Sequence, residues 1–185
     1  MTWLGKYGAC ASMVNVWRRR FEKLKLPTDV GSVLTRTGGI AARDGQTEFE
    51  VVVAGDRFDL FELHQNRDSD CLEFDRIEDV EKYLVTRIGD RLREKVGLVQ
   101  RSSQWSALDP SPDVSVRTVG GQVELIPTGD PNGRCLVGFE DGRWFGHAML
   151  LSVTELDAHL AEGIPGFNAL RPDWESRLGD ASENA

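Results

Sequence analysis

The hydrophobic positions of the chain follow two different rhythms. Over residues 14–24 and 77–96, apolar residues recur every three or four positions, which is the spacing of an amphipathic helix. The first segment ends at Pro27, which cannot continue a helix. At the start of the second segment, Asp75 and Glu78 form an Asp-x-x-Glu variant of the capping box. We therefore predict two amphipathic helices, of which the one over 77–96 is the longer.

The second rhythm, in which β-branched and aromatic residues alternate with polar ones, predicts strands. It covers residues 47–64, where Ala54-Gly55-Asp56 interrupts it as the turn of a hairpin would. The segment CLEF, residues 71–74, adds a short third strand. We expect this part of the chain to form an antiparallel meander that leads into the helix over 77–96.

A second meander is predicted further along the chain. Residues 114–127 contain two strands around Gly120-Gly121, a pair that a two-residue hairpin favours. Residues 134–152 show a similar pattern around Asp141-Gly142, so we predict another hairpin there and four antiparallel strands in all. The polar residues 100–113, rich in serine and proline, are predicted to form a loop.

Ser152 and Glu155 form a second capping box and predict a helix that ends at Gly163 and Pro165. Each meander is thus followed by a capped amphipathic helix. This order fits a degenerate internal repeat. The alternative is that the shared residues are only the capping and core positions that any strand-to-helix junction contains.

These elements predict a single α+β domain over residues 1–185, with antiparallel strands and about three helices. A chain of this length can bury a hydrophobic core of its own. The pattern leaves open whether the two meanders form one sheet. Residues 173–185 are acidic and rich in small residues, and we predict that they form a flexible tail.

The charge of the chain is −8 and is unevenly distributed. Residues 1–36 carry a surplus of five positive charges, whereas residues 37–81 carry thirteen carboxylates against four arginines. This balance argues against binding to nucleic acid or to an anionic membrane. It fits either a solvated surface that keeps the domain soluble or an acidic face directed at a basic partner.

The sequence contains no pattern typical of a catalytic or metal site. Its three cysteines and three histidines lack the spacing of a disulfide framework or a metal centre; they are Cys10, Cys71, Cys135, His64, His147 and His159. Nucleophile-elbow, zincin and phosphate-loop patterns are also absent. We therefore predict no catalytic residues, no metal and no cofactor. Because the apolar runs are too short to span a bilayer and no leader pattern is visible, we expect a cytoplasmic protein.

Two segments carry a resemblance to a known family: DRIEDVEKYLVTRIGDRLRE after the acidic hairpin, and WFGHAMLLSVTELDAHL, which begins in the second meander and runs into the helix after it. Over residues 45–165 this order resembles the immunity-protein (antitoxin) family that includes the inhibitor of the tuberculosis necrotising toxin. The resemblance implies a non-enzymatic cytoplasmic protein that binds a co-encoded secreted toxin as a 1:1 complex. Since the toxin of that best-known relative hydrolyses NAD, it also implies occlusion of a dinucleotide pocket.

The segment TWLGKYGAC at the N-terminus is a candidate for binding the toxin. Gly5 permits a tight, protruding backbone path, Lys6 offers a long cationic side chain, and Trp3 and Tyr7 are residue types enriched at interface hot spots. The alternative is that these residues pad the first helix and that Lys6 is simply solvated.

The acidic stretch DSDCLEFDRIEDVE is the second candidate for partner binding. Asp68, Asp70 and Glu73 could steer a basic toxin toward the protein. The same carboxylates could instead stand in for phosphates and block a nuclease toxin.

Two other classes of function stay open at this stage. A small-molecule-binding or regulatory domain would use a concave face of the second sheet, where Trp144, Phe145 and His147 cluster, and would need a deep apolar pocket there. An enzyme would need titratable groups that converge in a cleft, such as His64 beside a carboxylate.

Overall fold

The computed structural model of the chain describes residues 19, 30–34, 40–44, 47–63 and 71–164. It is an α+β fold of antiparallel strands, as predicted, and the strands form one eight-stranded sheet. The strands are β1 (Val30–Leu34), β2 (Ile40–Asp44), β3 (Glu48–Ala54), β4 (Arg57–Leu63), β5 (Cys71–Phe74), β6 (Val114–Val119), β7 (Gln122–Pro127) and β8 (Cys135–Gly138). The helices are α2 (Ile77–Lys95), α3 (Arg101–Ser106), α4 (Phe139–Ala148) and α5 (Val153–Ala161).

The two meanders join into one sheet, which the sequence pattern left open. The strand order is β1-β2-β3-β4-β5-β8-β7-β6, and the junction is the antiparallel pair of β5 and β8, with Phe74 opposite Cys135. On one side of this junction the five consecutive strands β1 to β5 lead into α2, and on the other side the three strands β6 to β8 lead directly into α4. The strand numbers rise from β1 to β5 on one side of the junction and fall from β8 to β6 on the other.

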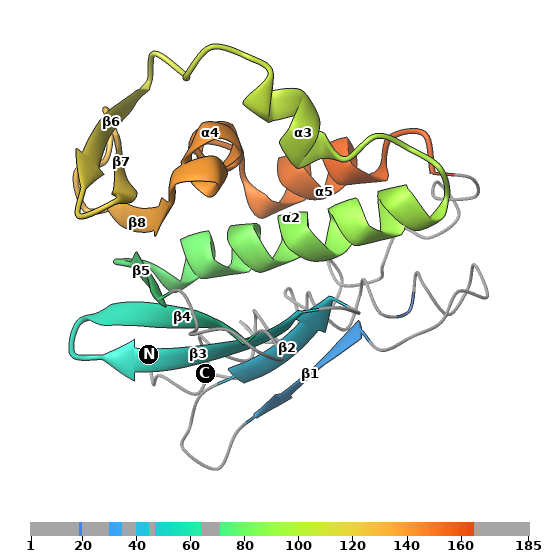
Figure 1. Cartoon of the computed structure of the whole chain (residues 1–185), viewed down its shortest axis with the longest axis horizontal. Coiled ribbons are helices and arrows are strands. Elements are labelled where there is room, and N and C mark those ends of the chain that lie inside the picture. The colour runs from blue at the N-terminus through green and yellow to red at the C-terminus, as the bar shows by residue number, and fades with distance from the viewer. Residues whose placement is uncertain (1–18, 20–29, 35–39, 45–46, 64–70, 165–185) are drawn as a thin grey trace, which may run out of the picture.

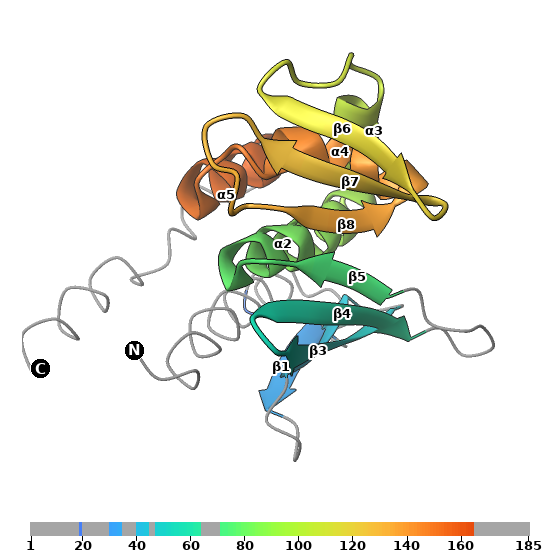
Figure 2. The same cartoon turned by 90° about the vertical axis from the view of Figure 1, so that its left-hand side faces the viewer.

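All described helices lie on the same side of the sheet. The sheet curves around α2, and α4 and α5 lie on the far side of α2 from strands β3 and β4 (Figure 1). After a turn of 90°, the strands from β6 to β4 form one continuous surface, with the helices behind it (Figure 2). We call this surface the helix-free face.

Two of the three predicted hairpins are confirmed, those around Gly55 and around Gly120-Gly121. Gly55-Asp56 joins β3 to β4, and Gly120-Gly121 joins β6 to β7 with one-to-one pairing along both ladders. Gly120 and Gly121 have φ values of 58° and 88°. A turn with positive φ at both central residues matches the twist of the flanking strands, and glycine adopts it without steric cost.

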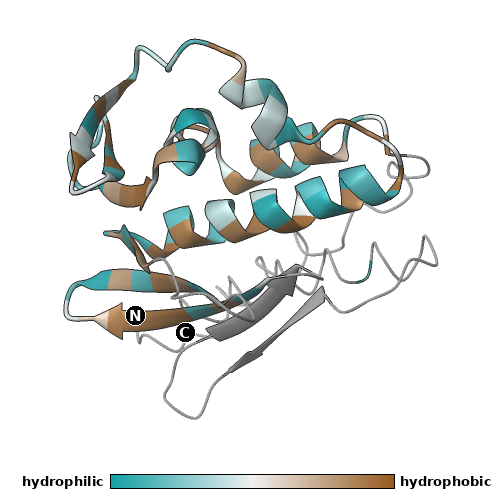
Figure 3. Ribbon diagram, viewed as in Figure 1, coloured by the Kyte–Doolittle hydropathy of each residue, from teal (hydrophilic) through white to brown (hydrophobic). Residues whose placement is uncertain are grey.

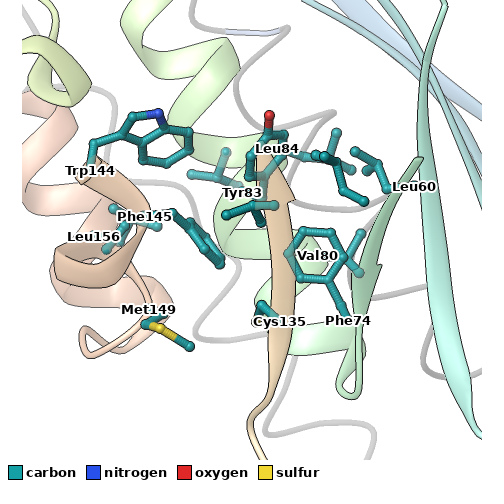
Figure 4. Close-up of a cluster of buried hydrophobic side chains, with 14 of the residues drawn as sticks. Leu60, Phe74, Val80, Tyr83, Leu84, Cys135, Trp144, Phe145, Met149 and Leu156 are labelled. Atoms are coloured by element: carbon teal, nitrogen blue, oxygen red, sulfur yellow. The ribbon is translucent and has the colours of Figure 1, made fainter. Parts of the chain in front are cut away.

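The core lies between the concave face of the sheet and the helices. The predicted long helix is α2, along which hydrophobic and hydrophilic residues alternate (Figure 3). Its apolar residues are buried, and so are several polar ones, among them Asp79, Thr86 and Arg93. At the centre, the rings of Phe74, Tyr83 and Phe145 pack edge to face with centroids 5.5 to 5.8 Å apart (Figure 4). Burying each such ring stabilises the fold by roughly 1.5–3 kcal/mol.

The predicted capping box at the start of α2 is wrong. The N-cap residue is Arg76, and its side chain makes no capping hydrogen bond. The backbone N–H of Asp75 instead donates to the carbonyl of Arg134 at 3.0 Å, which extends the pairing of β5 with the segment before β8. Glu78 is exposed in the first helical turn. By contrast, the capping box of Ser152 and Glu155 at the start of α5 is confirmed in both directions.

The predicted hairpin around Asp141-Gly142 is also wrong, because these residues belong to α4. The second meander therefore has three strands rather than four. The helix is favoured because Glu140 and Asp141 lie in its first turn, where carboxylates interact well with the helix dipole. Gly142 faces β7: a Cβ atom at this position would lie 2.9 Å from the Cβ of Val123.

The loop predicted over residues 100–113 contains the short helix α3. Its N-terminus is capped by a residue from another helix: the carboxylate of Asp90 accepts hydrogen bonds from the backbone N–H groups of Arg101 and Ser102, at 2.5 and 2.9 Å. A local reading of the sequence cannot reveal such a cap. The helix predicted over 14–24 and the tail predicted over 173–185 lie outside the described residues, Arg19 excepted.

Candidate functional site

Of the seven residues predicted to bind a partner, the structure describes one. Trp3, Gly5, Lys6 and Tyr7 lie outside the described residues, as do Asp68 and Asp70. Their roles stay predictions. Glu73 is the third of the four residues of the short strand β5, and its side chain is on the helix-free face with 19% of its surface exposed.

Glu73 is paired with two arginines. Its Oε2 accepts a hydrogen bond of 2.9 Å from Nη1 of Arg57 on β4, and Nη1 of Arg134 lies 3.5 Å away. The negative charge of Glu73 is thus already compensated within the fold. A basic partner could attract this carboxylate only in competition with Arg57 and Arg134.

These contacts belong to an alternating row of charges that runs across the helix-free face. Arg57 also donates to Asp59 at 3.1 Å, and Glu124 on β7 accepts hydrogen bonds from Arg134 and Arg117, at 2.8 and 2.9 Å. We call this row the ion-pair ladder. Its members are Asp59, Arg57, Glu73, Arg134, Glu124 and Arg117.

The ion-pair ladder is balanced and partly desolvated. Glu124 is 5% exposed, and the hydrogen bond from Arg134 lowers the pKa of this carboxyl below its usual value, although burial opposes the effect. The same hydrogen bond raises the pKa of Arg134. The ladder links four strands. Because partly buried charge-assisted hydrogen bonds are stronger than exposed ones, it also stiffens this face.

A second polar group lies in the interior, where the two halves of the fold meet. The hydroxyl of Tyr83 on α2 is 2.5 Å from Oε1 of Glu62 on β4 and 2.9 Å from Oδ2 of Asp141 on α4. The indole N–H of Trp144 donates to Oδ1 of Asp141 at 2.9 Å. Arg87 lies 3.7 Å from both carboxylates. The group therefore connects the first meander with α4 through α2.

The chemistry of this interior group is structural. Burial, followed by the nearby charge of Asp141, raises the pKa of Tyr83 well above its usual range, so the hydroxyl stays neutral and acts as a donor. Tyr83 and Glu62 are both buried. The group consists of two carboxylates that contact the Tyr83 hydroxyl, and it does not have the arrangement of an exposed nucleophile beside a base.

A small cavity of about 290 Å³ opens beside this group, at the lower limit of the usual size of ligand pockets. Its lining is mostly polar and includes Arg87, Asp90, Arg91 and Glu94 from α2. The indole of Trp144 borders it but is only 4% exposed. This cavity is not the deep apolar pocket that a small-molecule-binding domain would require.

The sequence predicts Trp144, Phe145 and His147 on the second sheet, but in the structure all three lie on α4. Trp144 and Phe145 are buried in the hydrophobic core, the second of them completely. They are packing residues because their rings fill the space between α4 and α2. His147 is half-buried, and its Nε2 atom has no hydrogen-bond partner.

Over the described ranges, no group of three or more histidine, cysteine or acidic residues could hold a metal ion. Cys135 is a buried free thiol, and burial raises its pKa well above the usual range, which suppresses the reactive thiolate. Of the described helices, none is long and apolar enough to cross a membrane.

Three exposed apolar side chains, on β6 and at the start of α4, are not indicated by the sequence pattern. Val116 and Val119 on β6 are 49% and 37% exposed, and Phe139 at the start of α4 is 57% exposed. The pattern VSVRTV, residues 114–119, predicts an ordinary strand of a meander. Nothing in it shows that β6 is the last strand of the sheet, which depends on how the two meanders join.

The structure therefore defines an α+β domain with all described helices on one side, a charged helix-free face and an exposed sheet edge. A family model described as Immunity protein 61 matches residues 27–158. The chain belongs to this immunity protein family, which confirms the resemblance that the two helical segments indicated.

A solved structure similar to this chain is that of Rv3902c from M. tuberculosis. The match covers 85% of this chain and 90% of that chain, with 14% sequence identity and a TM-score of 0.59. At this level of identity the likeness concerns the fold alone. No curated protein matches the chain.

Proposed function

We propose that this protein is a cytoplasmic antitoxin that binds a cognate secreted toxin as a 1:1 complex and occludes its active site. The observation that carries the proposal is the match of the Immunity protein 61 family over residues 27–158. Inhibition of this kind needs a rigid scaffold with anchors and a complementary rim, and it needs no catalytic residues.

The charge of the described body supports a basic partner. Residues 47–63 and 71–164 contain 21 carboxylates and 11 lysines or arginines. An acidic surface of this kind accelerates encounter with a basic protein by long-range attraction. The ion-pair ladder itself is balanced, so this steering comes from carboxylates elsewhere on the surface. Asp68 and Asp70, which directly precede β5 in the sequence, stay our candidates.

We further propose that the toxin hydrolyses NAD. This part of the proposal rests on the resemblance of the sequence to the immunity family of the tuberculosis necrotising toxin. In that case the protein would fill or cover a dinucleotide pocket of the toxin. A segment with aromatic and cationic side chains, such as Trp3, Lys6 and Tyr7, has the chemistry to enter such a pocket.

The experiment is co-expression with the toxin domain encoded in the adjoining gene. We expect cells that express the toxin alone to lose NAD and stop growing. Cells that also express this protein should keep their NAD and continue to grow. Light scattering of the purified mixture should give the mass of one copy of each chain. Growth arrest despite co-expression, or an adjoining gene without a toxin domain, would contradict the antitoxin function. Protection against a toxin that degrades nucleic acid while NAD stays constant would contradict only the NAD assignment.

A further inference from the structure

Strand β6 is the last strand of the sheet and has an open edge. Its pairing with β7 runs one to one, from Val114 opposite Pro127 to Val119 opposite Gln122. The N–H of Thr128 donates to the carbonyl of Asp113 at 2.8 Å, which makes Asp113 and every second residue after it the hydrogen-bonded positions of this ladder.

The residues between those positions turn their backbone groups away from β7. Val116 and Thr118 are such residues, so their N–H and C=O groups point outward from the edge. The N–H of Val114 points the same way but already donates to the carbonyl of Ser111 at 3.1 Å. Within the part of the chain that the structure describes, no strand lies beyond β6.

This edge lacks the features by which natural sheets prevent edge-to-edge pairing. Proteins usually protect an edge with proline, a bulge, lysine or a covering segment. Strand β6 has no proline, lysine or bulge, and five of its six residues are exposed. Its one charged residue, Arg117, is paired with Glu124 in the ion-pair ladder rather than directed along the edge. Val116 and Val119 add exposed apolar surface.

We propose that β6 binds an extended segment of the toxin, which adds to the sheet as a ninth strand. This inference deepens the proposed antitoxin function and rests on it. The outward N–H and C=O groups of Val116 and Thr118 would pair with the backbone of the toxin segment. Such β-augmentation draws its affinity from main-chain hydrogen bonds and its specificity from alternate side chains.

Charge determines the chemistry of the segment that fits. Asp109 and Asp113 are exposed at the start of β6, whereas the nearby Arg117 is held by Glu124. A toxin strand with apolar residues opposite Val116 and a lysine or arginine beside Asp113 complements this edge. A second copy of the chain fits less well, because it brings another net charge of −8.

The test compares three substitutions in binding to the toxin domain encoded in the adjoining gene. Val116→Pro removes one outward N–H that β7 does not use, and Thr118→Pro removes the next. Val116→Thr is the matched control, because it changes the side chain and keeps the N–H. We expect each proline to weaken binding roughly tenfold or more, and the control to change it by less than about threefold.

The same experiment separates the inference from the proposed function. Wild-type protein that does not bind the toxin would overturn both. Wild-type protein that binds, with proline variants that bind equally well, would overturn the ninth strand and leave the antitoxin function intact. An equal loss in all three variants would also overturn it, since side chains rather than the backbone would then be responsible.

Hydrogen exchange of the wild-type protein keeps the inference testable if a proline variant fails to fold. We expect the amides of Val116 and Thr118 to exchange at least about tenfold more slowly in the complex than in the free protein. Unchanged exchange would overturn the inference. A free protein that sediments as a dimer, and as a monomer once Val116 is replaced by proline, would show that a second copy occupies the edge and would overturn the toxin as its occupant.

Discussion

Gly89 on α2 packs directly against Leu160 on α5: a Cβ atom at position 89 would lie 2.9 Å from Cδ1 of Leu160 and 3.2 Å from its Cβ. The contact to Cβ matters because that atom moves only with the backbone of α5. Gly89 therefore sets the distance between the two helices, although glycine is unfavourable in the interior of a helix.

The first prediction is that Gly89→Ala destabilises the fold in spite of its better helix propensity. Overpacking a core of this kind costs typically 1–3 kcal/mol, which exceeds the propensity gain of about 1 kcal/mol. The free energy of unfolding, measured in urea, should fall. Gly129→Ala is the matched control, since no atom lies within 4 Å of the added Cβ. A more stable Gly89→Ala variant would mean that α5 shifts freely.

The second prediction concerns the hydroxyl between Glu62 and Asp141. Tyr83→Phe keeps the ring packing but leaves both carboxylates without this donor, which should cost about 1–3 kcal/mol of unfolding free energy. The control is Thr86→Val, which also deletes a buried hydroxyl. That hydroxyl donates only to the Lys82 carbonyl within the same helix, so its loss should cost less. Equal costs would show that the carboxylates do not depend on Tyr83.

The features that were predictable from the sequence are those that local residues determine. Gly120-Gly121 selects its hairpin, and Ser152 with Glu155 begins α5, because each acts on its own backbone within a few residues. The predictions are wrong where a residue distant in the sequence determines the local structure. Gly142 lies in a helix that packs on Val123, and α3 is capped by Asp90, eleven residues earlier than Arg101.

In the candidate site, too, the features that nearby residues determine are predictable from the sequence, and those that distant residues determine are not. The acidity of the region around Glu73 is visible in the sequence, but the compensation of its charge is not. Arg57 on β4 lies 16 residues before Glu73, and Arg134, in the segment before β8, lies 61 residues after it. The open edge at Val116 likewise appears only once β5 pairs with β8 and places β6 at the end of the sheet.

The third prediction is that Glu81 makes stability depend on pH near neutrality. Burial, with a further contribution from Glu78, raises the pKa of this carboxyl from 4.5 to about 7. A folded-state pKa above the unfolded value means that the native state holds the proton more tightly. The unfolding free energy should therefore be highest below pH 4.5 as far as this group is concerned, and should fall as the pH rises through about 7.

The variant Glu81→Gln tests the direction in which the unfolding free energy changes with pH. Because the side chain is half-buried rather than enclosed, we expect the variant to be more stable than wild type by roughly 1–2 kcal/mol at pH 8 and about equal at pH 4. Asp109→Asn, at an exposed loop position, should leave the difference between the two pH values unchanged. A wild-type protein that loses no stability between these pH values relative to Glu81→Gln would contradict the prediction.

The last prediction separates steering carboxylates from structural ones in the acidic stretch. Asp68 and Asp70 are predicted to attract a basic toxin, so replacing both with lysine should slow association at about 20 mM salt and have little effect at about 500 mM, where the Debye length is a few ångströms. Glu73 behaves differently because it is held by Arg57 and Arg134. Glu73→Gln should lower the unfolding free energy by about 1 kcal/mol and change the association rate less than the double lysine variant does. Stopped-flow association with the toxin domain, together with urea unfolding of each variant, measures both effects. If neither the double substitution nor the salt concentration changes the association rate, these aspartates have a role only in solubility. A large effect of Glu73→Gln on that rate would place the Glu73 carboxylate in the interface.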